Sequence, residues 1–305
     1  MEVNLELART EYLDKVATES GPIALRQYRY FLGALPDDVS PKGLDKWRTG
    51  LCASDLEPSS INRKLTAVRR FLYWLSRTEQ IPTSATAIRD NLANFRAHKK
   101  RTDLPGQDAI RALLEAALQR PGKKGIAYTR FVCIGLFAGL RPGEITSLTA
   151  RSLPEYKSYI QVTKTKTGID RHVYYRHSQV LNAVLPKLRT WAGTLVDSGA
   201  IGWFTLAARD AGWGEASKRN TLRKLCVSYC ACSRAFTEYE LALQFGHSAQ
   251  VSMDHYRDKS ILDTINPGST IEHWMGLPDG MAERLAEKCL ESPYGRNTAP
   301  IQQPS

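Results

Sequence analysis

The sequence predicts a mainly helical protein with one small β-hairpin, divided into a helical N-terminal domain and an α+β C-terminal domain. Its 305 residues are enough for two separate cores. Residues 60–77 and 107–120 carry apolar side chains at helical spacing, whereas residues 159–175 form two short β-like runs around a turn. We expect four parts: a helical domain over 1–85, a linker over 86–103, an α+β domain over 104–275, and a C-terminal helix with a flexible tail over 276–305.

The composition indicates an ordinary globular protein that binds a polyanion. The net charge is +11 and the pI is about 9.4, so nucleic acid is the partner that we expect. No apolar run approaches the roughly 18 residues of a membrane-spanning helix. The first 15 residues lack the apolar core of a signal peptide, and we therefore expect a protein that stays inside the cell, cytoplasmic or associated with the nucleoid.

One helix of the N-terminal domain, residues 60–77, has two contrasting faces. Its apolar face consists of Ile61, Leu65, Val68, Leu72 and Leu75. The opposite face carries Arg63, Arg70, Trp74 and Arg77, and no acidic residue occurs from 58 to 78. A basic face can simply be solvated. Because this one also has a tryptophan that we expect to be exposed, we interpret it as a surface that contacts DNA phosphates and sugars.

The first candidate for chemistry follows a helix too apolar for the surface, at residues 125–140. Arg141 precedes Pro142, which keeps Arg141 out of the helical region and suits the first position of a new helix. Arg141 should therefore project from a helix junction and bind phosphate. Glu144 stands at the spacing at which its carboxylate could orient the guanidinium.

The predicted hairpin places two lysines on its turn. Lys164 and Lys166 lie between the β-like runs, with Gly168 as the flexible turn residue. Lysines on exposed turns usually serve only solubility, but Lys164 could also contact DNA.

A later helical segment carries Asn220 and Arg223 one turn apart, followed by Cys226, Cys230 and Cys232. The cysteines raise the question of zinc. No CxxC pair and no histidine nearby in the sequence completes a tetrahedral site, so we expect no metal. The six cysteines also show no disulfide framework.

The next predicted helix opens with a Thr237–Glu240 capping box and stops at Gly246. His247 follows immediately, and Tyr256 lies nine residues further on. A tyrosine near the end of a short polar helix can present its hydroxyl to a cleft.

Together these segments resemble the tyrosine recombinases, the phage integrase family. The resemblance lies in G-L-R-x-x-E at 139–144, K-T-G at 166–168, Arg223 on its helix, and Gly-His followed by tyrosine nine residues later. It implies a core-binding domain followed by a catalytic domain. The catalytic residues it implies are Tyr256, Arg141, Lys166, Arg223 and His247, with Lys164 as the alternative lysine. Asn220 stands where the family has a histidine, and asparagine cannot carry a proton.

The function that this resemblance implies is site-specific recombination or integration of double-stranded DNA, as for a mobile genetic element or virus. A tetramer on two duplexes would cleave and rejoin strands through a 3′-phosphotyrosyl intermediate, without ATP, metal or other cofactor. Two alternatives remain open. One is a type IB topoisomerase-like enzyme that relaxes supercoils, and the other is a DNA-binding protein whose catalysis has weakened through Asn220.

The C-terminal helix is expected near residues 278–290, with Met281, Leu285 and Cys289 on one side. This weak apolar stripe could pack on its own chain. It could instead dock on a neighbouring subunit, as in family members that exchange a C-terminal helix, and this second placement is the hypothesis to test.

Overall fold

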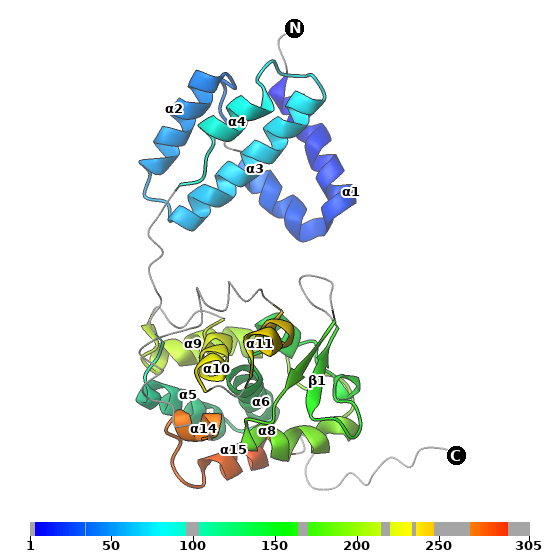
Figure 1. Cartoon of the computed structure of the whole chain (residues 1–305), viewed down its shortest axis with the longest axis vertical. Helices are drawn as coiled ribbons and strands as arrows, with labels where there is room; N and C mark the ends of the chain where they lie inside the picture. The colour runs from blue at the N-terminus through cyan, green and yellow to red at the C-terminus, as the bar shows by residue number, and fades with distance from the viewer. Residues whose placement is uncertain are drawn as a thin grey trace, which may run out of the picture. The chain divides into compact units, whose positions relative to one another are not determined.

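The computed structural model describes residues 4–33, 35–95, 104–163, 170–214, 220–233, 236–246 and 269–291. The chain forms two compact units, residues 1–100 and 101–305 (Figure 1). Within the described ranges, no helix is long and apolar enough to cross a membrane. The predicted class, mainly α with one small hairpin, is confirmed.

The first unit consists, in its described part, of helices around one apolar core. They are α1 (Leu5–Leu32), α2 (Pro41–Cys52), α3 (Pro58–Arg77) and α4 (Ala85–Asn91). α1 kinks at Gly21, whose φ of 76° is left-handed, and it resumes at Pro22. The other helices begin at prolines or serine caps, as at Ser40, whose side chain accepts the amide of Gly43.

α3 carries the core of this unit and confirms the predicted apolar face. Its five predicted apolar side chains are all buried, at 2% exposure or less. Arg63, Arg70 and Arg77 are exposed on the other side. Trp74 corrects the prediction, because it is half-buried and its ring lies 5.5 Å from that of Tyr12. An aromatic ring at the border of the apolar face gains more by covering the core than by facing water.

The predicted linker begins too early. α4 lies within the expected range of 86–103, yet Ile88 and Leu92 are fully buried in the core of the first unit. Asn62 on α3 also exchanges hydrogen bonds with the backbone of Phe95 at 2.7 and 3.0 Å. The first unit therefore extends at least to Phe95, because this segment has apolar side chains to bury and partners for its backbone groups.

The second unit is built around α6 (Gly122–Ala138), which is buried along almost its whole length. Helices α5, α8, α9, α10 and α15 all pack against it (Figure 1). The other elements are α5 (Gln107–Gln119), α7 (Pro142–Ile145), η1 (Ala150–Ser152), β1 (Tyr159–Val162), β2 (Arg171–Tyr174), α8 (Gln179–Val184), η2 (Leu185–Thr190), α9 (Ala200–Asp210), α10 (Thr221–Cys232), α11 (Glu238–Phe245), α14 (Ile271–Trp274) and α15 (Met281–Leu290).

Glycines on α6 allow α10 to approach it closely. A Cβ added at Gly135 would lie 2.7 Å from Leu222 Cδ1, so a larger residue there would push the helices apart. Gly139 ends α6 in the left-handed conformation, with φ of 64°. The chain then leaves the buried helix and reaches Arg141 within two residues.

The predicted hairpin is present as the antiparallel pair β1–β2, with Ile160 opposite Val173 and Val162 opposite Arg171. Its inward-facing residues, including Arg171 and Val173, are buried, and β2 packs against α11. The predicted turn residues 164–169 lie outside the described part of the chain.

α15 packs on its own chain, which is one of the two placements that the sequence left open. Met281, Leu285 and Cys289 are buried at 1% exposure or less, against α5, α6 and α8. The carbonyl of Cys289 accepts a hydrogen bond of 2.7 Å from Arg130 Nε on α6. The sequence of α15 alone did not show what covers its apolar stripe, because the helices that bury the stripe are distant in the chain.

Candidate functional site

Arg141 lies where α6 ends and α7 begins, as predicted. It is the N-cap of α7, with extended backbone angles (φ −70°, ψ 149°), and Pro142 is the first helical residue. The Glu144 carboxylate accepts a 2.8 Å bond from the Arg141 amide and a 2.9 Å bond from its Nη1. Glu144 therefore fixes both the backbone and the guanidinium of Arg141, whose side chain remains one-third exposed.

A second arginine, Arg171 at the start of β2, binds the same carboxylate. Its Nη1 and Nη2 donate to the two Glu144 oxygens at 3.0 and 2.7 Å, and its Nε donates to the Gln244 carbonyl at 3.0 Å. Both Glu144 and Arg171 are buried. Burial raises the pKa of the Glu144 carboxyl, but the bonds from Arg171 and Arg141 outweigh burial and lower the pKa overall.

Arg223 fastens α10 to the ends of two other helices. Its Nη1 donates to the Gly139 carbonyl at 2.7 Å, and its Nη2 donates to the carbonyl of Phe245. Those carbonyls belong to the C-terminal ends of α6 and α11, which lack helical donors and favour cations. The guanidinium also lies 5.4 Å from the centre of the Phe245 ring, and only 2% of the residue is exposed.

These contacts bring four segments to one place. The end of α6 leads into Arg141, β2 supplies Arg171, α10 supplies Arg223, and the last turn of α11 is held by Arg171 and Arg223 together. Among the described residues, the guanidinium groups of Arg141 and Arg171 bind the Glu144 carboxylate, and that of Arg223 binds the carbonyls of Gly139 and Phe245. The arrangement carries an excess of positive charge and suits an anionic ligand.

Comparison with known proteins identifies this architecture. No protein-family model and no curated protein matches the sequence. Among solved structures, a lambda integrase dimer bound to a COC′ core site matches with a TM-score of 0.60 at 16% identity, over 83% of this chain and 95% of that one. A Tn1549 transposon integrase bound to circular intermediate DNA matches with a TM-score of 0.59 at 13% identity, over 82% and 95%. A lambda integrase tetramer bound to a Holliday junction matches with a TM-score of 0.58 at 16% identity, over 82% and 76%.

The chain has the tyrosine recombinase fold. In this fold Arg141 is hydrogen-bonded to Glu144, and Arg223 binds the carbonyl of Gly139, two residues before Arg141. Arg171 was missed by sequence reasoning. The alternation of β2 could have indicated it. Arg171 lies two residues before the buried Val173, so both side chains point to the same face of the strand, and a buried arginine needs a partner for its charge.

Asn220 stands at the N-cap position of α10 and is exposed. It is the N-cap residue, with φ −94° and ψ 0°, and its side chain makes no capping bond. Arg223, one turn later, is buried. The two residues thus share the helix end while facing different surroundings.

The remaining predicted site residues, Lys164, Lys166, His247 and Tyr256, lie outside the described residues. The structure does describe the elements that lead to them. β1 ends at Val162 and β2 begins at Arg171, and both lysines fall in the sequence between these two strands. α11 ends in a left-handed Gly246, as predicted, with φ of 59°.

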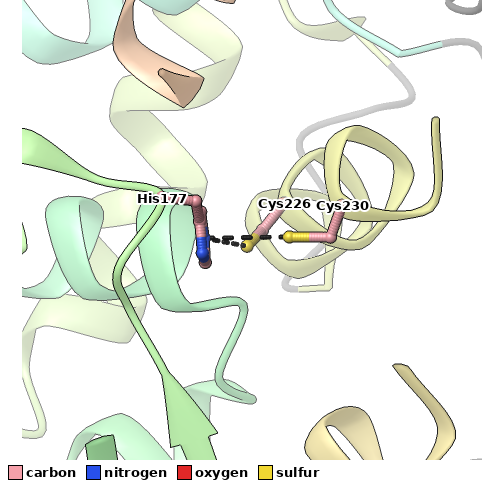
Figure 2. A group of neighbouring side chains, drawn as sticks. All are labelled: His177, Cys226 and Cys230. Atoms are coloured by element: carbon pink, nitrogen blue, oxygen red, sulfur yellow. Dashed lines mark hydrogen bonds between the residues drawn. The ribbon is translucent and has the colours of Figure 1, made fainter. Parts of the chain in front are cut away.

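One group of described residues could hold a metal ion. His177, which follows β2, lies beside Cys226 and Cys230 on α10, and all three are buried (Figure 2). The expectation of no metal was based on the absence of a histidine near these cysteines in the sequence, and the fold brings one beside them. The histidine comes from a segment 49 residues before Cys226, so only the folded chain brings it near.

Proposed function

We propose that the protein is a site-specific DNA recombinase that cleaves and rejoins DNA strands through a 3′-phosphotyrosyl intermediate. The observation that carries this proposal is the paired anchoring of Arg141 by Glu144 and of Arg223 by the Gly139 carbonyl, two residues from Arg141. The likeness of the fold to integrases bound to DNA and the net charge of +11 support it.

The two arginines would act on the phosphate that is transferred. Phosphoryl transfer needs in-line positioning and neutralisation of the charge on the non-bridging oxygens, and forked guanidinium groups provide both. Arg141 is one-third exposed, so it can reach a ligand while Glu144 holds it. Rigid anchoring matters because a donor that is already in place needs no reorganisation during the reaction.

Tyr256 is the proposed nucleophile. The ordinary pKa of tyrosine is about 10, so forming the phenolate at pH 7 costs about 4 kcal/mol. Nearby guanidinium groups would offset part of this cost. Attack on the phosphorus forms the tyrosyl ester and releases the 5′ oxygen, which Lys166, or alternatively Lys164, would protonate. The ester conserves the energy of the broken bond, so rejoining needs neither ATP nor a metal.

His247 follows Gly246 directly, which supports a place for it in the same site. Arg171 binds the carbonyl of Gln244 and Arg223 binds that of Phe245, so both arginines hold the turn from which His247 leaves. A Cβ added at Gly246 would lie 3.4 Å from Arg171 Cδ. The last described residue before His247, Gly246, therefore lies beside Arg171.

We propose that double-stranded DNA is bound partly by the exposed face of α3. Arg63 and Arg77 are exposed there, and Arg70 donates a 3.0 Å hydrogen bond to the Tyr28 hydroxyl. Assembly as a homotetramer on two duplexes is the form we propose, by analogy with the integrase tetramer on a Holliday junction.

Two other functions use the same residues. A type IB topoisomerase-like enzyme would relax supercoiled plasmid without any specific site, whereas the recombinase should join two matching sites. A protein with weakened catalysis would bind DNA but cleave it slowly, and Asn220 is the observation that favours this second candidate.

The test is a nicked suicide substrate that traps the covalent intermediate. The wild-type protein should form a protein–DNA adduct, and Tyr256→Phe should bind DNA without forming it. Tyr239→Phe on α11 is the matched control, because Tyr239 is 72% exposed and should be dispensable. An adduct that maps to any other tyrosine would refute the assignment of the nucleophile.

A further inference from the structure

The strongest unassigned feature is the buried cluster of His177, Cys226 and Cys230. His177 Nε2 lies 3.8 Å from Cys226 Sγ and 3.7 Å from Cys230 Sγ, and Figure 2 shows the ring directed at both sulfurs. The three candidate ligand atoms lie within 4.8 Å of one another. No residue proposed for DNA cleavage belongs to this cluster.

These distances match a shared metal ion. Zinc binds cysteine sulfur at about 2.3 Å and histidine nitrogen at about 2.0–2.1 Å, so ligands on one ion lie about 3.5–3.6 Å apart in a tetrahedral site and about 3.7–3.8 Å apart in a trigonal one. The two observed nitrogen–sulfur distances fall at the trigonal value. Little movement would therefore be needed to bind an ion.

The apolar surroundings of the cluster favour a metal complex without net charge. The His177 ring packs edge-on against Phe236 at 5.7 Å and is tilted against Tyr229 at 6.1 Å, so apolar walls exclude water. An apolar site disfavours net charge. Two thiolates cancel the charge of a divalent ion, which makes the zinc complex neutral and also acceptable beside Arg223, one turn before Cys226.

We propose that His177, Cys226 and Cys230 form a binding site for a thiophilic d10 metal ion, with Zn²⁺ as the first choice and Cu⁺ as the alternative. Both cysteines bind Zn²⁺ as thiolates, and any proton that a thiol carries in the metal-free protein is released to solvent. His177 Nε2, which now contacts the Phe137 carbonyl at 2.8 Å, gives its nitrogen lone pair to the metal, and the ring proton resides on Nδ1. Nδ1 has no hydrogen-bond partner among the described groups. The Phe137 oxygen then lies where it can become a fourth ligand.

The site would fasten together the segments that carry the arginines. Phe137 lies two residues before Gly139, whose carbonyl accepts Arg223, and Cys226 lies one turn after Arg223 on α10. His177 follows β2, which begins with Arg171. The metal would thus cross-link the end of α6, α10 and the segment after β2. Its binding should raise the stability of the second unit and also affect cleavage activity.

The experiment is metal titration of the reduced full-length protein after removal of bound metal. Zn²⁺ affinity is measured against a competing chelator, Co²⁺ reports thiolate coordination through its charge-transfer absorbance, and Cu⁺ is tested separately without oxygen. We expect the protein to bind one equivalent of Zn²⁺, or one equivalent of Cu⁺ if copper is the metal that the site takes. The Tm should rise by about 5–10 °C at a free metal concentration of about 100 times the Kd.

Variants locate the site. Cys230→Ala and His177→Gln should weaken binding at least about 100-fold, because each removes a ligand of a three-residue site. The glutamine can still donate to the Phe137 carbonyl, so it separates loss of metal from loss of that hydrogen bond. Cys133→Ala is the matched control, because Cys133 is equally buried on a helix but lies outside the cluster. Failure of the folded wild-type protein to take up either ion, or binding that survives in both ligand variants, would overturn the proposal.

Discussion

Replacement of Arg171 by methionine tests whether the buried ion pair of Arg171 and Glu144 organises the site. The change keeps an apolar stem but removes three donors, two to Glu144 and one to the Gln244 carbonyl. Loss of one partner of a buried ion pair typically costs about 3–5 kcal/mol. Glu144 retains the Arg141 amide and side chain, so we expect the lower end, about 3 kcal/mol.

This destabilisation can be measured by thermal unfolding followed by circular dichroism. A loss of about 3 kcal/mol should lower the Tm of the second unit by about 6–12 °C, given about 2–4 °C per kcal/mol for a domain of its size. Arg209→Met on α9 is the control. Arg209 is exposed and pairs with Asp210 at 3.6 Å, so its replacement should change the free energy of unfolding by less than about 1 kcal/mol.

The effect on cleavage should be separable from the effect on folding. At a temperature at which both proteins are folded, Arg171→Met should slow single-turnover cleavage by about 100-fold, because Glu144 would lose the two donors of Arg171 and would orient the Arg141 guanidinium less rigidly. The double variant Glu144→Gln/Arg171→Met removes the uncompensated buried charge. It should be more stable than Arg171→Met alone and should still cleave slowly.

Two results would refute this reasoning. If Arg171→Met unfolds at the wild-type temperature, the buried pair does not stabilise the junction of α6, β2 and α11. If the variant is destabilised but cleaves at the wild-type rate, the pair supports the fold without positioning Arg141.

Two further predictions concern protonation. The pKa of Glu144 is lowered in the folded state, so its stabilising contribution is complete above the ordinary carboxyl pKa of about 4.3 and is lost as the pH falls through the lowered folded value. The difference in free energy of unfolding between the wild type and Glu144→Gln, measured with urea from pH 7 to pH 3, should therefore shrink at the acid end, and a constant difference would contradict the assignment. Asn220→His should raise the single-turnover cleavage rate between pH 6 and 9, because a positioned acid–base group typically contributes about 10²–10⁴-fold, while Asn220→Ala should lower it. DNA affinity should change little in either variant, since phosphate contacts elsewhere dominate binding, and a slower Asn220→His protein at every pH would mean that the site is built around asparagine.

The sequence by itself determined the local structure on which the site is built. The Arg141–Pro142 junction, the Thr237–Glu240 capping box, the stop at Gly246 and the β1–β2 hairpin all appear where they were predicted. Each follows from steric and hydrogen-bonding rules that act within about four residues. The apolar face of α3 was likewise predictable, because helical periodicity alone selects which side is buried.

The tertiary structure alone decided which distant groups meet. Glu144 and Arg171 are 27 residues apart, Arg223 and Gly139 are 84 apart, and His177 and Cys226 are 49 apart. No local rule links such positions, because their contact depends on how α6, α10, α11 and the hairpin pack. The same reason explains why the sequence left the placement of α15 open and why α4 was expected in a linker. The apolar surfaces that bury these two helices come from helices elsewhere in the chain, and only packing reveals which surface is left to cover.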